Sequence, residues 1–211
     1  MTPLRDPAVN AVIDKLVAAQ QYPPADPRSG RERDPHEYGE YGFSISPDQG
    51  DLIYLLCRGL RATRTVEFAT SVGMSTLYAA AAVRDNGGGT VIGAELVPAK
   101  IAAARRNLAE AGLADYAEIR EGDARVTLRD LGGKVDFALI DGWLGVQPSL
   151  AREVIEFVAP QVRIGGYVLN DNAEPDFLDY IRDPANGFVS VSLPLHGGTE
   201  LCVKTAERRE D

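Results

Sequence analysis

The aliphatic run 167–169 ends in three short polar residues, Asn170, Asp171 and Asn172, and Asp141 ends another apolar run earlier in the chain. Asn and Asp are common where a strand turns into a loop, because their side chains hydrogen-bond the local backbone. Carboxylate and amide oxygens are also the ligands that hard divalent cations such as Mg²⁺ prefer. The cluster is therefore either a set of loop caps or an oxygen-ligand site, and other parts of the chain must decide between the two.

Short apolar runs alternate with helical patterns from residue 64 onward. The expected strands are 65–68, 90–94, 117–120, 135–140, 162–169, 187–193 and 199–205. The expected helices between them are 74–83, 98–111, 126–131, 148–158 and 175–180. The first five strands are continuously apolar, which indicates a parallel sheet covered by helices on both faces. The last two strands are joined by a short link, which is compatible only with antiparallel pairing.

In such a sheet Asp141 ends the fourth strand, and Asp171 with Asn172 ends the fifth. Adjacent parallel strands lie about 5 Å apart, so the three oxygen donors would converge at one edge of the sheet. Two carboxylates and an amide oxygen suit Mg²⁺, which keeps open positions for water or substrate oxygens. The alternative, polar strand ends that merely cap loops, stays open.

Three features precede the expected sheet. Residues 7–20 carry apolar side chains at helical spacing, which predicts an amphipathic helix. The segment 21–42 is rich in Pro, Gly and charge, which predicts either an unstructured connector or a lid over a site. The stretch SPDQ at 46–49 is a capping box with proline at the first helical position, and it predicts the start of another helix.

The loop after the first strand, in VEFATSVGMST, has the small residues of a ligand-binding turn. Glu95 ends the next strand, and this arrangement would place a nucleotide-like ligand along a helix start with its ribose hydroxyls on the carboxylate. The three-glycine fingerprint of dinucleotide folds is absent, because Gly73 is the only glycine here and Ala69 stands where close backbone approach is needed. An acidic Glu67 would also repel a pyrophosphate. Both features suit a cofactor with an ammonium group and one carboxylate.

The helix expected at 98–111 follows the strand of Glu95. Its apolar residues share one face, as in an amphipathic helix that covers a sheet. We therefore expect Lys100, Arg105 and Arg106, which lie away from that face, to point to water.

Composition limits the classes of function. A chain of 211 residues is long enough for one domain with a full core. The net charge of −9 disfavours nucleic acid as a partner, since such binding depends on a basic surface. No apolar run is long enough to cross a bilayer and no signal-peptide core is present, so we expect no membrane partner and a cytoplasmic location. Two cysteines are too few for a disulfide framework or a cysteine-based zinc site.

Five stretches come in the order and spacing of the class I S-adenosylmethionine-dependent methyltransferases. They are VEFATSVGMSTL, GAELVPAKIAAARRNLAEAGL, EIREGDA, VDFALIDGW and GGYVLNDN. The closer resemblance is to the divalent-metal-dependent O-methyltransferases, which include catechol O-methyltransferase and the caffeoyl-coenzyme A group. It extends from SISPDQGDLIYLL, which begins at Ser44, to LPLHGGTELCVK near the end of the chain.

The resemblance implies a single Rossmann-like methyltransferase domain over residues 1–211. Residues 1–42 would form an N-terminal helix and a proline-rich lid or connector, and residues 43–211 the catalytic core. The core would hold a mostly parallel seven-stranded sheet with an antiparallel C-terminal hairpin, helices on both faces and extra N-terminal helices. A homodimer is expected on the same ground.

The resemblance also implies a role for individual residues toward S-adenosylmethionine. Glu67, Gly73 and Ser75 would hold the methionine end of the cofactor, with the backbone of Ile45 nearby. Ala69 and Ser71 of the same loop would also bind the cofactor. The ribose would lie on Glu95, and the adenine against Asp123, Ala124 and Trp143, with Asp141 also in contact with the cofactor. In the alternative interpretation, Gly73 and Ser75 are turn and cap residues, Trp143 is a core anchor and Glu95 is solvated.

Asp141, Asp171 and Asn172 match the metal ligands of the resembled family residue by residue. Because the metal would activate the substrate, these three residues are also the predicted catalytic residues. That family commonly has a lysine general base where this chain has Leu144. Either the metal alone acidifies the substrate, or another group takes the proton, or the substrate is not a catechol. The two histidines, His36 and His196, are expected to be surface residues, although His36 lies on the possible lid.

The predicted function is a Mg²⁺-dependent O-methyltransferase acting on a small hydroxylated molecule, aromatic and catechol-like. One alternative is a metal-independent methyltransferase in which Asp171 and Asn172 orient a hydroxyl or an amine. Another is a domain that binds S-adenosylmethionine without transferring methyl groups. An NAD-dependent reductase is disfavoured by the missing glycines and by Glu67.

Overall fold

A computed structural model describes residues 2–21, 34–142, 148–195 and 198–209. Seven strands form one sheet in the order β3-β2-β1-β4-β5-β7-β6. The strands are β1 (Arg64–Phe68), β2 (Thr90–Glu95), β3 (Ala117–Glu121), β4 (Val135–Ile140), β5 (Val162–Asp171), β6 (Phe188–Leu193) and β7 (Thr199–Lys204). The neighbours from β3 to β5 are parallel, whereas β7 is antiparallel to both β5 and β6. The predicted sheet and its C-terminal hairpin are confirmed.

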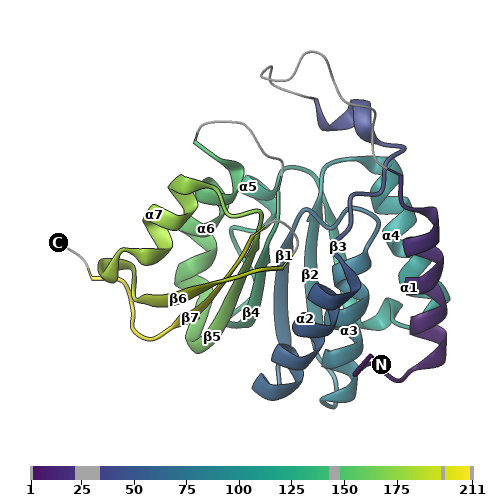
Figure 1. Cartoon of the computed structure of the whole chain (residues 1–211), viewed down its shortest axis with the longest axis horizontal. Helices are drawn as coiled ribbons and strands as arrows, with labels where there is room; N and C mark the ends of the chain where they lie inside the picture. The colour runs from purple at the N-terminus through teal and green to yellow at the C-terminus, as the bar shows by residue number, and fades with distance from the viewer. Residues whose placement is uncertain (1, 22–33, 143–147, 196–197, 210–211) are drawn as a thin grey trace.

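Helices cover both faces of this sheet (Figure 1). They are α1 (Pro7–Ala19), α2 (Pro47–Leu60), α3 (Met74–Asp85), α4 (Pro98–Glu110), α5 (Ala124–Thr127), α6 (Leu150–Val158) and α7 (Pro175–Arg182). One apolar core lies between the sheet and α1 to α4, and a second lies between the opposite face and α5 to α7. The fold therefore has three layers, with α1 and α2 as the predicted N-terminal additions. No helix within the described ranges is long and apolar enough to cross a bilayer.

Several helices are preceded by a residue whose side chain accepts hydrogen bonds from the first backbone N–H groups. Asp6 caps α1, Ser46 caps α2 and Ser149 caps α6, each through a side-chain oxygen. Helix α3 instead begins at Gly73, whose φ is +90°. A Cβ there would lie 3.2 Å from the Cβ of Ala104 in α4, so both the backbone angle and the helix packing require glycine.

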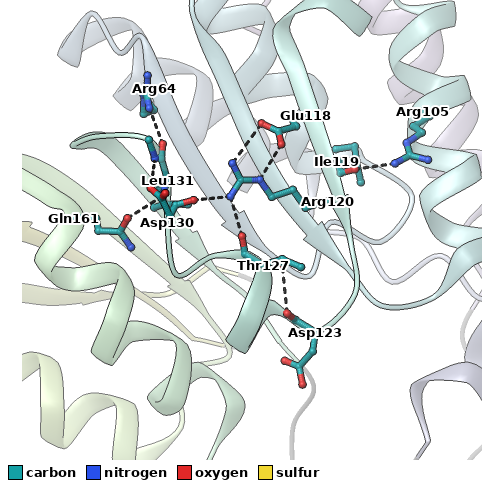
Figure 2. A network of polar contacts seen from close by, with 11 residues as sticks. Arg64, Arg105, Glu118, Ile119, Arg120, Asp123, Thr127, Asp130, Leu131 and Gln161 are labelled. Atoms are coloured by element: carbon teal, nitrogen blue, oxygen red, sulfur yellow. Dashed lines mark hydrogen bonds and ion pairs between the residues drawn. The ribbon is translucent and has the colours of Figure 1, made fainter.

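The helix expected at 126–131 is wrong in its bounds, because α5 is shorter and begins two residues earlier. Arg120 of β3 provides the physical reason (Figure 2). Its Nη1 donates to the carbonyl oxygens of Thr127 at 2.8 Å and Asp130 at 2.7 Å. These bonds satisfy backbone oxygens that have no partner past the helix end. Leu128, between the two acceptors, and Leu131, which follows them, are both buried in the core.

Candidate active site

A pocket of about 340 Å³ lies at the edge of the sheet where the parallel strands have their C-terminal ends. Ligands bind at this edge in open α/β sheets. The predicted site residues that line the pocket are Ala69, Ser71, Glu95, Asp123, Ala124, Asp141, Asp171 and Asn172. The structure thus brings the ends of β1 to β5 and their loops together around one space.

Four other predicted residues, Ile45, Glu67, Gly73 and Ser75, do not line this pocket. Glu67 is 2% exposed and accepts hydrogen bonds from the Ser75 hydroxyl at 2.8 Å and from the Thr76 hydroxyl at 2.5 Å. Burial raises the pKa of Glu67. These contacts anchor the start of α3 to β1, and direct contact with the cofactor stays a prediction.

Two further residues from the sequence, Trp143 and Leu144, lie outside the described residues, as does His196. His36, in the short 3₁₀ helix Pro35–Tyr38 (η1), is described but does not line the pocket. Pro35 of the same turn does, so the N-terminal segment reaches the pocket wall.

The loop after β1 holds two non-glycine residues in the left-handed region, Ala69 with φ of 68° and Ser71 with φ of 50°. The backbone N–H groups of Ala69 and Thr70 both donate to the carbonyl oxygen of Ala94 at 3.1 Å. The Ser71 N–H donates to Glu95 at 2.7 Å. The hydroxyl of Ser71 is buried and has no hydrogen-bond partner among the described residues. The loop is therefore fixed by β2 and presents an unused hydroxyl at the pocket.

Glu95 has a carboxylate that the backbone holds in place. Oε2 accepts from Ser71 N–H, and Oε1 accepts from the N–H groups of Leu96 and Val97 at 2.9 Å each. The side chain is 8% exposed and lines the pocket. Two carboxylate oxygens have about four lone-pair sites, so acceptor capacity remains for hydroxyl groups of a ligand.

The far end of the pocket combines apolar walls with one ion pair. Phe68, Leu150 and Val154 supply apolar surface near Ala124. Asp123 caps α5 and pairs with Arg125, whose Nη2 lies 2.7 Å from Oδ2. The hydrogen bond from Arg125 holds the pKa of Asp123 below its ordinary value. A flat ring bound here would lie against the apolar side chains, with its edge near the polar groups of Asp123 and Arg125.

The segment that carries Asp123 is tied to the sheet by a polar network (Figure 2). The Thr127 hydroxyl donates to the carbonyl oxygen of Asp123 at 3.2 Å, and Arg120 holds the carbonyl oxygen of Thr127. Arg64 of β1 donates to the carbonyl oxygen of Leu131 at 2.6 Å. The loop that forms the far wall is thereby fixed relative to β1 and β3.

Asp141 and Asp171 form a pair of like charges at the ends of β4 and β5. Burial raises the pKa of Asp141 well above its ordinary value, and the charge of Asp171 raises it further. Asp171 is 3% exposed and accepts hydrogen bonds from Gln49 Nε2 at 2.9 Å and from Asn172 Nδ2 at 2.8 Å. Two close carboxylates favour either a shared proton or a bound cation.

Asn172 supplies the third possible ligand. Its φ is 53°, in the left-handed region that Asn tolerates better than most residues. Its amide nitrogen is used on Asp171, so its amide oxygen is left as an acceptor. No three His, Cys, Asp or Glu side chains of the described residues form a metal-binding group. A cation site here would combine the amide oxygen of Asn172 with the two carboxylates, and this set of hard oxygens fits Mg²⁺.

A family model described as a methyltransferase domain matches residues 66–173, which span this site. The chain belongs to this family. Similar proteins carry names from the group of O-methyltransferases that the sequence resembles.

Two similar proteins are named catechol O-methyltransferase. The protein of Niastella koreensis is 32% identical over 148 residues, which cover 65% of this chain and 66% of the relative. The protein of Mycobacterium tuberculosis is 32% identical over 142 residues, which cover 64% of each. The chain thus spans just under two thirds of the length of these curated relatives.

The fold is shared with solved structures of lower identity. An O-methyltransferase from Bacillus cereus in complex with SAH is 20% identical, with a TM-score of 0.68 over 95% of this chain and 92% of that one. The O-methyltransferase TomG from Streptomyces achromogenes, in complex with SAM, is also 20% identical, with a TM-score of 0.68 over 96% of this chain and 91% of that one. These matches show the methyltransferase fold.

The sequence prediction about Lys100 is also wrong. Lys100 does not point to water; it is 5% exposed and lines the pocket. Its Nζ lies 4.8 Å above the centre of the Phe43 ring. Burial lowers the pKa of Lys100, and the charge of Glu95 opposes that change. Phe43 comes from a distant part of the chain, so the periodicity of α4 alone could not reveal that this face is covered.

Sequence reasoning also missed Gln49 and Phe43. Gln49 is fully buried and contacts Asp171, whereas the capping box suggested a purely local role. Phe43 lines the pocket and packs near Tyr38; the two ring centres lie 6.3 Å apart and the rings are tilted by 51°. Phe43 lies shortly before the capping box and Gln49 lies within it. Their closeness to the start of α2 was the only sequence signal that could have pointed to them.

Proposed function

We propose that this chain is an S-adenosylmethionine-dependent O-methyltransferase that acts on a small hydroxylated aromatic molecule with the help of a divalent cation. The observation that carries the proposal is one pocket that contains both the fixed carboxylate of Glu95 and the pair Asp141 and Asp171 beside Asn172. The names of the relatives, catechol O-methyltransferase and tricin synthase, support a hydroxylated aromatic acceptor.

The residues fit S-adenosylmethionine by their chemistry. Glu95 would accept hydrogen bonds from the two ribose hydroxyls, because its backbone partners leave lone pairs unused. The unpartnered hydroxyl of Ser71 would bond the amino-acid part of the cofactor. Asp123 and Ala124 would border the adenine against the apolar wall. When bound, the cofactor supplies the methyl group.

The residues at the ends of β4 and β5 also have the chemistry to bind a divalent cation. Asp141, Asp171 and Asn172 would hold it, and the cation would offset the repulsion of the two carboxylates. When bound, it supplies Lewis acidity that lowers the pKa of a substrate hydroxyl and orients that hydroxyl for attack. Asp141 and Asp171 are fixed at neighbouring strand ends, so the substrate oxygen would be placed near the cofactor with little loss of entropy on reaction.

The reaction would be an in-line displacement in which the acceptor oxygen bonds to the methyl carbon while the bond between that carbon and the cofactor sulfur breaks. S-adenosylhomocysteine would be the leaving group, and the hydroxyl proton would pass to solvent. Residues 1–42 would form the N-terminal helix and a proline-rich lid or connector, and residues 43–211 the catalytic core of one domain. The predicted homodimer belongs to the same proposal, and size-exclusion chromatography with light scattering tests it.

Methyl transfer from labelled S-adenosylmethionine to a panel of vicinal diphenols, with Mg²⁺ or with EDTA, tests the proposal. We expect transfer that disappears in EDTA. Transfer that survives EDTA would instead favour the metal-independent methyltransferase. No transfer in either condition, with cofactor binding retained, would favour a domain that only binds the cofactor.

Asp141→Ala is expected to lower Mg²⁺-dependent turnover at least 100-fold, on the order of 3 kcal/mol of transition-state stabilisation, because it leaves a half-built cation site. Turnover is measured at saturating cofactor. Asp130→Ala, which removes an exposed acid away from the pocket, is the control. Wild-type turnover of Asp141→Ala would exclude the metal assignment.

A further inference from the structure

We infer that Gln49 is the residue that positions Asp171 to bind a cation, and this inference rests on the metal-assisted function proposed above. Gln49 lies in the first turn of α2 and is 0% exposed. Its Nε2 donates to Asp171 Oδ1 at 2.9 Å and to Thr199 Oγ1 at 3.1 Å. The residue acts through Asp171 and is a positioning residue.

The contact is not a by-product of helix capping. The Gln49 N–H donates to Ser46 Oγ at 3.4 Å, which is half of a capping box. The reciprocal half would turn the Gln49 side chain back to the Ser46 backbone. Instead the side chain extends toward β5 and β7, so the residue gives up a local bond for a bond to Asp171.

The arrangement also leaves Gln49 incompletely satisfied. Both hydrogens of Nε2 are used, but the buried Oε1 has no hydrogen-bond partner in the described part of the chain. A buried oxygen without a partner destabilises a fold. Packing and capping alone would therefore favour an apolar residue here, and the bond to Asp171 supplies a reason for an amide.

A neutral donor suits a carboxylate that must still bind a cation. Gln49 holds Oδ1 of Asp171 from one side, and Asn172 Nδ2 holds Oδ2 from the other at 2.8 Å. These two bonds fix the plane of the carboxylate. Neither donor carries a charge, so the negative charge of Asp171 stays available, which a lysine or arginine donor would neutralise.

A purely structural role makes a different prediction. Thr199 begins β7, and its hydroxyl donates to the carbonyl oxygen of Leu195 at 3.1 Å while it accepts from Gln49. If Gln49 only links α2 to β7, removal of the Thr199 hydroxyl would have the same effect as removal of the Gln49 amide. If Gln49 positions Asp171, only removal of the Gln49 amide weakens the affinity for the cation.

The experiment measures Mn²⁺ affinity of the full chain by electron paramagnetic resonance, together with S-adenosylhomocysteine affinity by calorimetry. The variants are Gln49→Met, Gln49→Asn and Thr199→Val. We expect both Gln49 variants to weaken Mn²⁺ about 10–100-fold, the usual effect of losing a partner behind a metal ligand. Thr199→Val should change Mn²⁺ affinity less than about twofold, and S-adenosylhomocysteine affinity should stay within about twofold in every variant.

Near-UV circular dichroism checks the fold, and Gln49→Asn, which keeps an amide but is too short to reach Asp171, carries the test if Gln49→Met does not fold. Unchanged Mn²⁺ affinity in the Gln49 variants, or an equal loss in Thr199→Val, would overturn the inference. A wild-type chain that does not bind Mn²⁺ would instead overturn the metal-assisted function, and the two failures are thus distinguishable.

Discussion

At the scale of single residues, Glu95 both holds the pocket loops together and lines the pocket. Its carboxylate accepts three backbone N–H groups, from Ser71, Leu96 and Val97. Those bonds hold the loop after β1 and the turn before α4 in a fixed relation. The charge that would bind the ribose is therefore placed before any ligand arrives.

Glu95→Ala is expected to weaken S-adenosylhomocysteine binding by at least about 1.5–3 kcal/mol, the value of hydrogen bonds to a charged acceptor. The release of the Ser71 N–H would add to this loss. Calorimetry measures the effect. Glu121→Ala is a matched control, since Glu121 is the exposed partner of Glu95 on β3. If wild type and Glu95→Ala bind S-adenosylhomocysteine equally well, Glu95 does not bind the ribose.

Lys100 illustrates the cost of a charge in the pocket wall. Burial lowers the pKa of Lys100 below its ordinary value of 10.5. The folded state therefore binds this proton less tightly than the unfolded state. Burial of the charged amine therefore lowers the free energy of unfolding at pH 7. This loss disappears as the pH rises from the lowered pKa through 10.5.

Lys100→Met is expected to raise the free energy of unfolding at pH 7 by about 1 kcal/mol, because it removes the buried charge but keeps the packing volume. The gain over wild type should shrink as the pH rises toward 10.5 and the amine becomes neutral. Urea unfolding at several pH values measures it. Arg106→Met, at an exposed position of the same helix, is the control, and a destabilised Lys100→Met would contradict the prediction.

At the scale of elements, Asp136 joins the starts of β1, β4 and β5. Its Oδ2 accepts from the N–H groups of Thr63 at 2.8 Å and Arg64 at 3.1 Å, and its Oδ1 accepts from Arg163 Nε at 2.6 Å. Burial alone would raise the pKa of Asp136, but the hydrogen bonds from Arg163, Thr63 and Arg64 hold it below its ordinary value. This contribution to stability is present above pH 3.8 and is lost as the pH falls through the lowered pKa.

Asp136→Asn is expected to cost about 1 kcal/mol of stability at pH 7, after allowance for the partial exposure of the site. The difference from wild type should vanish in acid, where the carboxyl of the wild type is protonated. Chemical denaturation between pH 2 and 7 measures it. Asp115→Asn, at an exposed position in the turn Ala114–Tyr116, is the control, and a difference that persists in acid would contradict the assignment.

The elements were predictable because they depend on local patterns. Continuous apolar runs identify β1 to β5, and Pro7, Pro47 and Pro98 correctly mark the first positions of helices. The length of α5 was not predictable, because its end is set by Arg120 of a different element. Local patterns cannot report a partner that arrives from another strand.

The same reason divides the candidate site. Asp141, Asp171 and Asn172 could be placed from the sequence, because strand ends of a parallel sheet meet at one edge. Glu67 was harder to place, since its side chain turns to the hydroxyls at the start of α3 rather than to the pocket. Gln49 was missed because its partner lies 122 residues away.

At the scale of the whole molecule, the sheet is buried between two separate cores, and the pocket opens at its edge. The pocket walls come from elements of both cores, including α4 on one face and α6 on the other. A ligand in this pocket therefore contacts both layers of helices, and its binding should stabilise the fold as a unit.

S-adenosylhomocysteine at 100 times its dissociation constant is expected to stabilise the fold by about 2.7 kcal/mol. For a chain of this size, that corresponds to a rise in Tm of about 5–10 °C. Differential scanning fluorimetry measures the shift, with NAD⁺ at the same concentration as the comparison. A shift with NAD⁺ and none with S-adenosylhomocysteine would point to the reductase alternative.

Ala69, Ser71 and Asn172 line the pocket with positive φ angles of 68°, 50° and 53°. Each such backbone costs on the order of 1–2 kcal/mol for a residue with a side chain, and glycine would relieve it. Glycine at these positions would also let the backbone adopt other conformations when no ligand is bound, so the shape that binding needs would be populated less. Selection for heat tolerance and selection for turnover would therefore act on these three codons in opposite directions.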